Sequence, residues 1–166
     1  LIDIIDKTVS AMGSRLLKRW LAFPLNTKLK IDQRIDTVSF LKSNTELQST
    51  LRSYLKEIND LERLVSKIAT QKITPREVLQ LKNSLDIINS CKDSLSQSKL
   101  AALVRIADHL NPCDALRTKI NSSLSEDPPV NILKGNAIKS GYSSELDEFR
   151  KIAFSGHDYL DEMIER

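Results

Sequence analysis

The sequence holds few of the residues from which disulfide frameworks, metal sites and catalytic centres are built. Its 166 residues include two cysteines, two histidines, four glycines and five prolines. Cys91 and Cys113 are too few to form the disulfide framework of a small secreted protein, so we expect a reducing, cytoplasmic setting. Because 40% of the residues are apolar, the chain is too hydrophobic to stay disordered. The composition therefore predicts a folded, soluble and helical protein.

The scarcity of histidine and cysteine also argues against a metal site. His109 and Cys113 are the only close pair of such ligands, and Asn111-Pro112 between them should break any helix that they could share. His157 lies in a charged helical segment, where an ordinary exposed histidine is expected. The acidic residues near it are expected to form a solvated helix face and not paired catalytic carboxylates; they are Asp158, Asp161, Glu162 and Glu165. We predict no metal ligand in this chain.

Glycine is too sparse for a nucleotide-binding loop. A loop that cradles phosphates needs the spacing Gly-x-x-x-x-Gly-Lys, and glycine occurs only at positions 13, 135, 141 and 156. Sequence order alone does not exclude a Ser-His-Asp or Cys-His centre, but two histidines offer few possible bases. The aromatic residues lack the interleaved basic residues of a surface that stacks single strands. We predict no catalytic or cofactor-binding residue in this segment, and the sequence assigns no residue to nucleic-acid binding.

Long apolar runs are missing as well. No run approaches the roughly 18 residues of a membrane span, and the N-terminus lacks the layout of a signal peptide. The chain begins with Leu1, and its last helical pattern continues to Arg166 without a stop signal. We therefore expect a segment cut from a longer protein, with no membrane partner.

The net charge of +3 is small, but the charges are unevenly distributed. Residues 1–42 carry eight Lys or Arg against four Asp or Glu, whereas residues 143–166 carry three against seven. The basic surplus could meet phosphate, although a solvated helix face is the expected interpretation at this density. Since the acidic end would repel a nucleic-acid backbone, we expect at most weak, non-specific binding to duplex DNA, lost at moderate salt.

The strongest helical pattern lies near the start of the chain, in residues 8–25. Its apolar residues recur three and four positions apart and form one stripe along a helix; they include Val9, Met12, Leu16 and Trp20. Pro24 should end this helix near Ala22, because proline disfavours helical geometry in the preceding residue.

Two features of this helix predict a close-packed central position. Gly13 is costly inside a helix, so we expect it to let another backbone come close. Arg15 and Lys18, on the basic face, are expected to contact neighbouring helices or domains and not to read bases.

Further helices follow with a period near 3.6, and no segment alternates long enough to predict a sheet core. Their expected ranges are about residues 29–43, 45–58, 59–71, 75–90, 100–110 and 112–124. Residues 91–99 are polar and serine-rich and are expected to form a loop.

Capping patterns mark where several of these helices begin. The best defined start has Thr74 as cap, Pro75 in the first helical position and Glu77 three residues after the cap. Ile73 should pack on Val78 across this entry. The other expected caps are Thr45 with Gln48, Asn59 with Glu62, Asn111, and one of Ser143 or Ser144.

The composition changes over residues 125–143. Asp127-Pro128-Pro129 disfavours helix, and Gly135-Asn136 predicts a tight turn between Ile132-Leu133 and Ala137-Ile138 as short extended pieces. A last helix follows, with apolar residues in alternating steps of three and four that suit packing along another long helix. This seam consists of Leu146, Phe149, Ala153, Gly156, Leu160 and Met163.

The sequence thus predicts an all-α, multi-helix bundle with a long projecting C-terminal helix. We expect a helical core bundle at residues 1–124, an irregular connector at 125–143 with short extended pieces or a hairpin at about 127–142, and the long helix at 144–166.

Residues 8–25 follow the pattern Thr-x-Thr-x-Met-Gly-x-Arg-Leu-Leu-x-x-Trp-Leu-x-x-Pro-Leu, with Ser10 in place of the second Thr. The matching residues are Thr8, Met12, Gly13, Arg15, Leu16, Leu17, Trp20, Leu21, Pro24 and Leu25. Further motifs follow in order: Arg34-Ile35-Asp36-Thr37-Val38, Asp60-Leu61-Glu62-Arg63-Leu64, Pro75-Arg76 with Leu81 and Ser84-Leu85, Asp127-Pro128-Pro129, and Gly135, Ile138, Gly141-Tyr142, Leu146-Asp147 and Arg150. Together they closely resemble the core, or lever, domain of MutS-type DNA mismatch repair proteins, over essentially the whole chain.

The resemblance implies a helical segment between two functional domains of such a protein. Members of the family are dimeric clamps that find mispaired or looped-out bases, exchange ADP for ATP and signal to a MutL-like partner. Their mismatch-reading Phe-x-Glu lies in an N-terminal domain and their ATP-binding loop in a C-terminal domain, and this chain contains neither motif. ATP and Mg are therefore expected in the parent protein, a DNA-dependent ATPase at work on the bacterial nucleoid, and no enzymatic activity is expected in this segment.

We expect the helix from about Ser144 to be one arm of a lever, seated on the bundle of residues 8–124, that relays nucleotide state to the DNA-gripping clamp. Its seam would face a returning lever helix. Two other classes stay open: a stand-alone helical adaptor that binds a partner helix along the last helix, and a small helical enzyme such as a hydrolase. The sequence beyond Arg166 would separate lever from adaptor, since the resemblance demands a clamp followed by Gly-x-x-x-x-Gly-Lys.

Overall fold

The computed structural model describes the backbone of residues 2–164 and the side chains of residues 2–153, 155 and 156. Within this part of the chain the secondary structure is helical, without a β-strand, so the all-α prediction is confirmed. The helices are α1 Ile2–Ile5, α2 Ala11–Ala22, α3 Lys28–Ser43, α4 Thr45–Glu57, α5 Leu61–Ala69, α6 Pro75–Ser96, α7 Ala101–His109, α8 Asp114–Ser123, the 3₁₀ helix η1 Ile132–Lys134, and α9 Ser144–Ile164.

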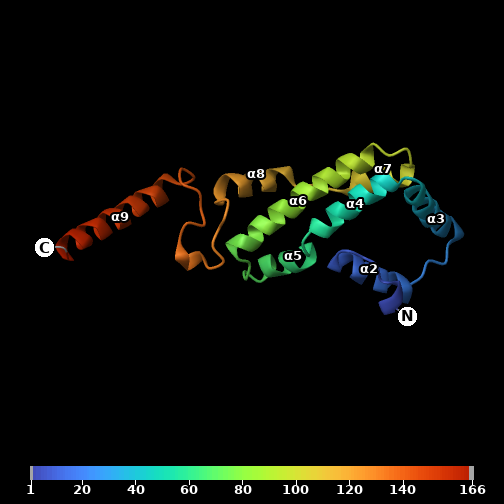
Figure 1. Ribbon diagram of the computed structural model, residues 1–166, viewed down its shortest axis with the longest axis horizontal. Helices are drawn as coiled ribbons and strands as arrows, with labels where there is room; N and C mark the ends of the chain where they lie inside the picture. Colours follow the sequence, from blue (N-terminus) through green and yellow to red (C-terminus); the bar gives the residue numbers. More distant parts are fainter. Residues whose placement is uncertain (1, 165–166) are drawn as a thin grey trace.

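Helix α6 is the central element of the bundle. Helices α4, α5, α7 and α8 all pack against it, and Figure 1 shows them arranged along its length. One apolar cluster joins α5 to the first half of α6 through Leu64, Leu81 and Leu85. A second joins the end of α6 to α7 through Leu95, Leu103 and Ala107, with side chains of α3 and α4 packed on it. Burial of these clusters supplies the main stabilising free energy of the bundle.

The loop predicted at residues 91–99 is wrong for 91–96, because α6 continues to Ser96, and it is confirmed for 97–99. Cys91 and Leu95 are buried, as are Leu81 and Leu85 earlier in α6, so the apolar period carries on through the serine-rich stretch. The Ser96 hydroxyl donates to the carbonyl of Lys92 in the preceding turn, which lets a serine reside in a helix without an unsatisfied group.

The capping box predicted at Thr74 is confirmed, with Pro75 at the first helical position. The Thr74 side chain accepts from the backbone N–H of Glu77, and the Glu77 carboxylate accepts from the backbone N–H of Thr74.

Three other predicted caps are wrong by one or two positions. Helix α4 is capped by Asn44 and not Thr45, and α5 by Asp60 and not Asn59. The residue before α8 is Cys113, in a left-handed conformation with φ 53°, while the Asn111 side chain accepts from the Cys113 backbone N–H at 2.9 Å. Asn and Asp side chains that can each bond a nearby N–H compete for the cap position, and tertiary contacts decide between them. At α9 the Ser143 side chain accepts from the N–H of Leu146, so Ser143 is the cap of the two serines considered.

Helix α2 ends at Ala22, as predicted, but it is peripheral and not central. None of its residues is buried, and Leu16, Trp20 and Leu21 each stay more than two fifths exposed. The explanation expected for Gly13 is also wrong. A Cβ atom added there would lie 3.1 Å from Ser10 Oγ and 3.4 Å from Thr8 Cβ, so the missing side chain makes room for the start of its own helix and not for another backbone.

The connector at 125–143 differs from the predicted hairpin. Ile132–Lys134 forms a 3₁₀ turn, and the extended pairing joins Ile138 to Leu124 at the end of α8. Gly135 and Asn136 have positive φ, as a tight turn requires. This turn directs residues 137–139 back to α8, where Lys139 N–H donates to the Ser123 carbonyl at 2.8 Å.

Helix α9 projects away from the rest of the molecule (Figure 1). It is attached to the connector and is not seated on the bundle as expected. Arg150 Nη2 donates to the Ile138 carbonyl at 2.8 Å, and the Gly141 N–H donates to Asp147 at 2.6 Å. Both bonds arise in the first two turns of α9, because only these turns lie beside the connector.

Candidate functional surfaces

The motif residue Arg15 joins α2 to α5. Its Nη1 and Nη2 atoms donate to both carboxylate oxygens of Asp60 at 2.9 and 2.7 Å, and its Nε donates to Glu62 at 2.7 Å. We call these three residues the Arg15 joint. These hydrogen bonds raise the pKa of Arg15 and lower the pKa of Asp60. The prediction that Arg15 contacts a neighbouring helix is confirmed. The identity of its partners could not be predicted from local sequence patterns, because Asp60 and Glu62 lie 45 and 47 positions away.

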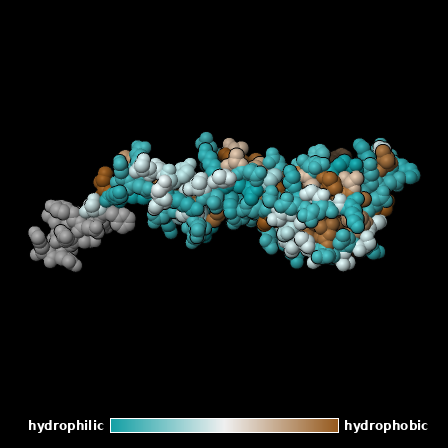
Figure 2. Space-filling model, turned by 90° about the horizontal axis from the view of Figure 1, so that it is seen from above, coloured by the Kyte–Doolittle hydropathy of each residue, from teal (hydrophilic) through white to brown (hydrophobic). Residues whose placement is uncertain are grey.

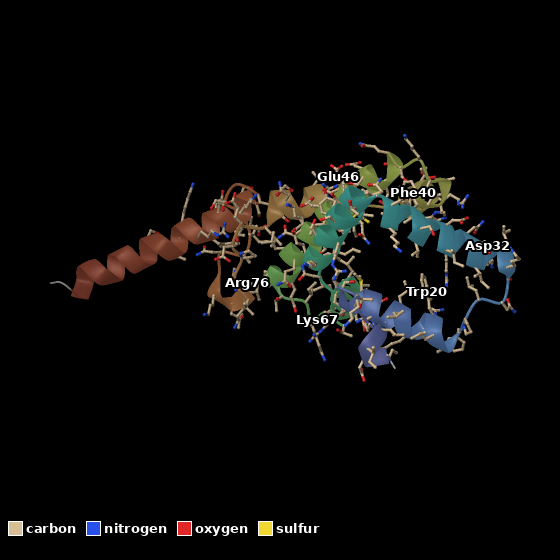
Figure 3. All side chains as sticks on the ribbon, turned by 45° about the vertical axis from the view of Figure 1, so that its right-hand side comes forward. Trp20, Asp32, Phe40, Glu46, Lys67 and Arg76 are labelled. Carbon is tan, nitrogen blue, oxygen red and sulfur yellow. The ribbon has the colours of Figure 1, made fainter. Side chains whose placement is uncertain are left out.

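Trp20 forms a second tie between α2 and the bundle. The guanidinium carbon of Arg34, in α3, lies 3.6 Å from the centroid of a Trp20 ring, which is a cation–π contact. Figure 3 shows Trp20 on α2, with α2, α3 and α4 along three sides of a triangle. Both partners belong to the motifs that carry the family resemblance.

An apolar cavity of about 640 Å³ lies between the start of α2 and α4. Its apolar lining comes from Val9, Met12, Leu16, Leu41, Leu51 and Leu55. Lys7, Arg52 and Glu62 also border it, and Glu62 is engaged by Arg15. Seen from above, the end of the molecule that holds α2 to α4 brings apolar atoms to the surface (Figure 2).

The residue beside the Arg15 joint connects it to the centre of α6. Asn59 precedes the α5 cap Asp60, and its backbone N–H donates to Ser84 Oγ at 3.1 Å. Ser84 is fully buried and donates in turn to the Gln80 carbonyl at 2.9 Å. Arg15 of α2 is therefore connected to the interior of the bundle through its hydrogen bonds to Asp60, the peptide bond between Asp60 and Asn59, and the hydrogen bond from Asn59 to Ser84.

Ion pairs fix the neighbouring helices to one another. Lys67 pairs with Glu77 between α5 and α6, and that ammonium, with the Thr74 backbone N–H, lowers the pKa of Glu77 to about 2. Asp86 accepts from Lys82 and from Arg117 of α8. Burial opposes ionisation of Asp86, but the two cations hold its pKa below the ordinary value.

Ion pairs and hydrogen bonds also join the connector to α6 and to α9. Arg76, next to the cap of α6, pairs with Asp127 of the connector at 3.0 Å. The Gly141 N–H, and after it Arg150, lowers the pKa of Asp147 at the start of α9. These residues also come from the motifs of the resemblance, so the motifs mark contacts between elements.

The structure describes three of the four histidine and cysteine side chains of the chain, namely those of Cys91, His109 and Cys113. His109 Nδ1 lies 2.6 Å from the Arg105 carbonyl oxygen, and the Cys113 thiol donates a hydrogen bond to the Asn111 carbonyl, so each residue has a local partner. Among the residues that the structure describes, no three His, Cys, Asp or Glu side chains gather to hold a metal ion. Both cysteines are free, and burial raises the pKa of the Cys91 thiol. The side chains of His157 and of the acidic residues from Asp158 onward lie outside the described residues.

Among the helices that the structure describes, we find no candidate for a membrane-spanning segment.

A family model described as MutS domain III matches residues 1–165. The chain belongs to the MutS domain III family. This finding confirms the resemblance recognised from the motifs.

Similar proteins include three that are named DNA mismatch repair protein MutS. The chain is 55% identical over 166 residues to the DNA mismatch repair protein MutS of Christiangramia forsetii and 52% identical over 166 residues to that of Flavobacterium johnsoniae. It is 43% identical over 160 residues to the MutS of Bacteroides fragilis. Each match covers all or nearly all of this chain but 19% of the relative. The chain thus spans about a fifth of the length of the curated relatives and corresponds to the domain III part of a MutS-like protein.

Proposed function

We propose that this segment is the lever region of a DNA mismatch repair protein and links an ATPase domain to a DNA-gripping clamp. The observation that carries the proposal is the projection of α9 from the connector, with apolar side chains exposed along its first turns. Phe149, in the predicted seam, is 61% exposed, and Ile152 beside it is 66% exposed. The 21 residues of α9 make a rigid rod about 30 Å long.

The attachment of α9 suits such a role. Its described hydrogen bonds to other elements go to the connector, at Ile138 and Gly141, and the connector is in turn held to α6 by Arg76 and Asp127. A rigid helix that is attached through a few hydrogen bonds to a short connector can change its angle to the bundle while the bundle stays intact, as hinged elements in allosteric proteins do. Leu160 and Met163, the last two residues of the predicted seam, lie outside the described side chains.

The rest of the proposal concerns the parent protein. We propose that it binds mismatched duplex DNA as a dimer in the bacterial cytoplasm, at the nucleoid, uses ATP and Mg outside this segment, and contacts a MutL-like protein. The segment itself would catalyse no reaction and would bind duplex DNA only weakly and without regard to sequence. ATP hydrolysis by the 166-residue chain, or mismatch-selective binding in a gel-shift assay, would overturn these two statements.

The lever role is tested by measuring distances in the parent protein. Spin labels are attached to cysteines replacing Lys119 in α8 and Lys151 in α9, both exposed, with Cys113 changed to serine. We expect the distance between the labels to change when ADP is replaced by ATP in the presence of mismatched DNA.

A matched pair of labels controls for changes within the bundle. Glu57 in α4 is also exposed, and the distance from Glu57 to Lys119 should stay constant in both nucleotide states. A constant Lys119 to Lys151 distance in every state would contradict the lever. An open reading frame that ends near Arg166, with no clamp or ATP-binding loop, would favour the helical adaptor instead.

A further inference from the structure

Helix α2 is held to the bundle by polar contacts more than by apolar packing. None of its residues is buried, and the cavity of about 640 Å³ separates its first turns from α4. Apolar side chains that face each other across a space of this size make few dispersion contacts with one another. The docking of α2 therefore depends to an unusual degree on the Arg15 joint and the Trp20–Arg34 contact.

We propose that α2 is a latched arm, which docks on the bundle through the Arg15 joint and swings away as a unit when the joint is broken. The latch is a fork of three charge-assisted hydrogen bonds from one guanidinium, a geometry that is strong when formed and lost in one step. Its side chains are all partly exposed, so dissolved ions screen the attraction between them.

The arm can move as one body because its two helices are tied together. Asp6, directly after α1, accepts from Ser14 Oγ in α2 at 2.6 Å and from Thr8 Oγ1 at 2.6 Å. These bonds lower the pKa of Asp6 to about 2, so the tie persists across the ordinary pH range. Helices α1 and α2 thus form a small rigid unit.

The hinge lies in the segment between α2 and α3. Phe23 to Thr27 are outside both helices, and Pro24 prevents α2 from continuing. Phe23, Pro24, Asn26 and Thr27 are exposed and Leu25 is only partly buried, so little apolar packing holds this segment in place. The inference concerns docking of α2 alone and stands whether or not α9 acts as a lever.

The only tryptophan of the chain reports on the latch. Trp20 lies on the arm and contacts Arg34 across the hinge, so opening of the arm changes its fluorescence. We expect its accessibility to acrylamide to rise as NaCl is increased from about 0.05 M to about 1 M, while the far-ultraviolet circular dichroism of the helices stays constant. Unchanged quenching over this range would overturn the proposal.

Hydrogen exchange of the same 166-residue chain locates the motion. In Arg15→Gln the amides of α2 should exchange roughly three- to tenfold faster, while those of α6 exchange as in the unmodified chain. Glu62→Gln should give a smaller effect in the same direction, and Asp60→Asn tests the other carboxylate while keeping a side-chain oxygen to cap α5. Arg76→Gln, which removes an exposed ion pair remote from α2, is the matched control and should leave α2 unchanged.

Either of two results would refute the latch. Exchange in α2 that is unaffected by Arg15→Gln would show that the joint does not hold the helix. Equal acceleration in α2 and α6 would show that Arg15 stabilises the whole fold and does not control a separate arm.

Discussion

At the scale of single residues, Ser84 illustrates how a small polar group can join two elements. It lies fully buried in α6, and its hydroxyl accepts from the backbone N–H and side-chain Nδ2 of Asn59 while donating to the Gln80 carbonyl. A buried hydroxyl with all its bonds made is tolerated in a core, whereas a lost partner leaves a buried donor or acceptor unsatisfied. The chain between α4 and α5 is thereby fixed to the middle of α6.

Replacing Ser84 by alanine should destabilise the protein by about 1–3 kcal/mol, because the Asn59 N–H then has no partner inside the bundle. Urea unfolding followed by circular dichroism measures the change. Ser96→Ala is the control, since that exposed hydroxyl bonds only to carbonyls of its own helix, and it should change the free energy of unfolding by less than about 0.5 kcal/mol. Equal effects of the two substitutions would contradict the role given to Ser84.

Glu77 makes the stability depend on pH. Its pKa in the folded protein is about 2, below the ordinary 4.5, because of Lys67 and the Thr74 backbone N–H. A carboxyl whose pKa is depressed by folding contributes stability above its unfolded pKa and loses it as the pH falls toward the folded value. We expect the free energy of unfolding to fall between about pH 5 and pH 2, and Glu77→Gln should make this decline shallower. A decline of identical slope in the variant would exclude Glu77 as a contributor.

At the scale of secondary structure, the helices and the strongest cap could be predicted because their signals are local. The apolar period and the sequence Thr74-Pro75-x-Glu77 involve residues within one turn of each other. The serine-rich end of α6 could not be predicted, because its composition favours a loop, while burial of Cys91 and Leu95 keeps it helical. That burial depends on tertiary packing, which overrides weak propensities.

The cluster between α6 and α7 should be the most sensitive to loss of volume. Leu103 in α7 is 3% exposed and packs with Leu95 and Ala107. Leu103→Ala should lower the free energy of unfolding by about 2–5 kcal/mol through lost burial and the cavity left behind.

Leu116→Ala in α8 is the matched control for that substitution, because Leu116 is 43% exposed. It should cost less than about 1 kcal/mol. Thermal or urea unfolding of the two variants side by side measures the difference, and a cost for Leu103→Ala no greater than that for Leu116→Ala would be incompatible with a core at this position.

At the scale of the whole molecule, large apolar side chains are exposed on α2 and α3, on the connector and on the first turns of α9. Figure 1 shows where these elements lie along the molecule. The residues include Leu16, Trp20, Ile35, Val38, Phe149 and Ile152. We expect other protein segments to cover apolar side chains that are exposed in such numbers.

The 166-residue chain should therefore self-associate as its concentration rises. Light scattering over a dilution series measures the average mass, and Phe149→Glu should weaken association because it places a charge in the α9 seam while leaving the helix exposed as before. A strict monomer at every concentration would contradict the assignment of this seam as a packing surface.

The order of amino acids alone specifies most of the helices, the end of α2 at Ala22, the start of α6 at Thr74-Pro75, and membership of the MutS domain III family through motifs in a fixed order. All of these depend on neighbouring residues or on their succession along the chain. Three-dimensional packing was needed to show that α2 is peripheral, that Asp60 and not Asn59 caps α5, and that Arg15 binds carboxylates 45 and 47 positions away. A contact between residues so far apart leaves no periodicity to detect, because it forms only when packing around α6 brings the two segments together.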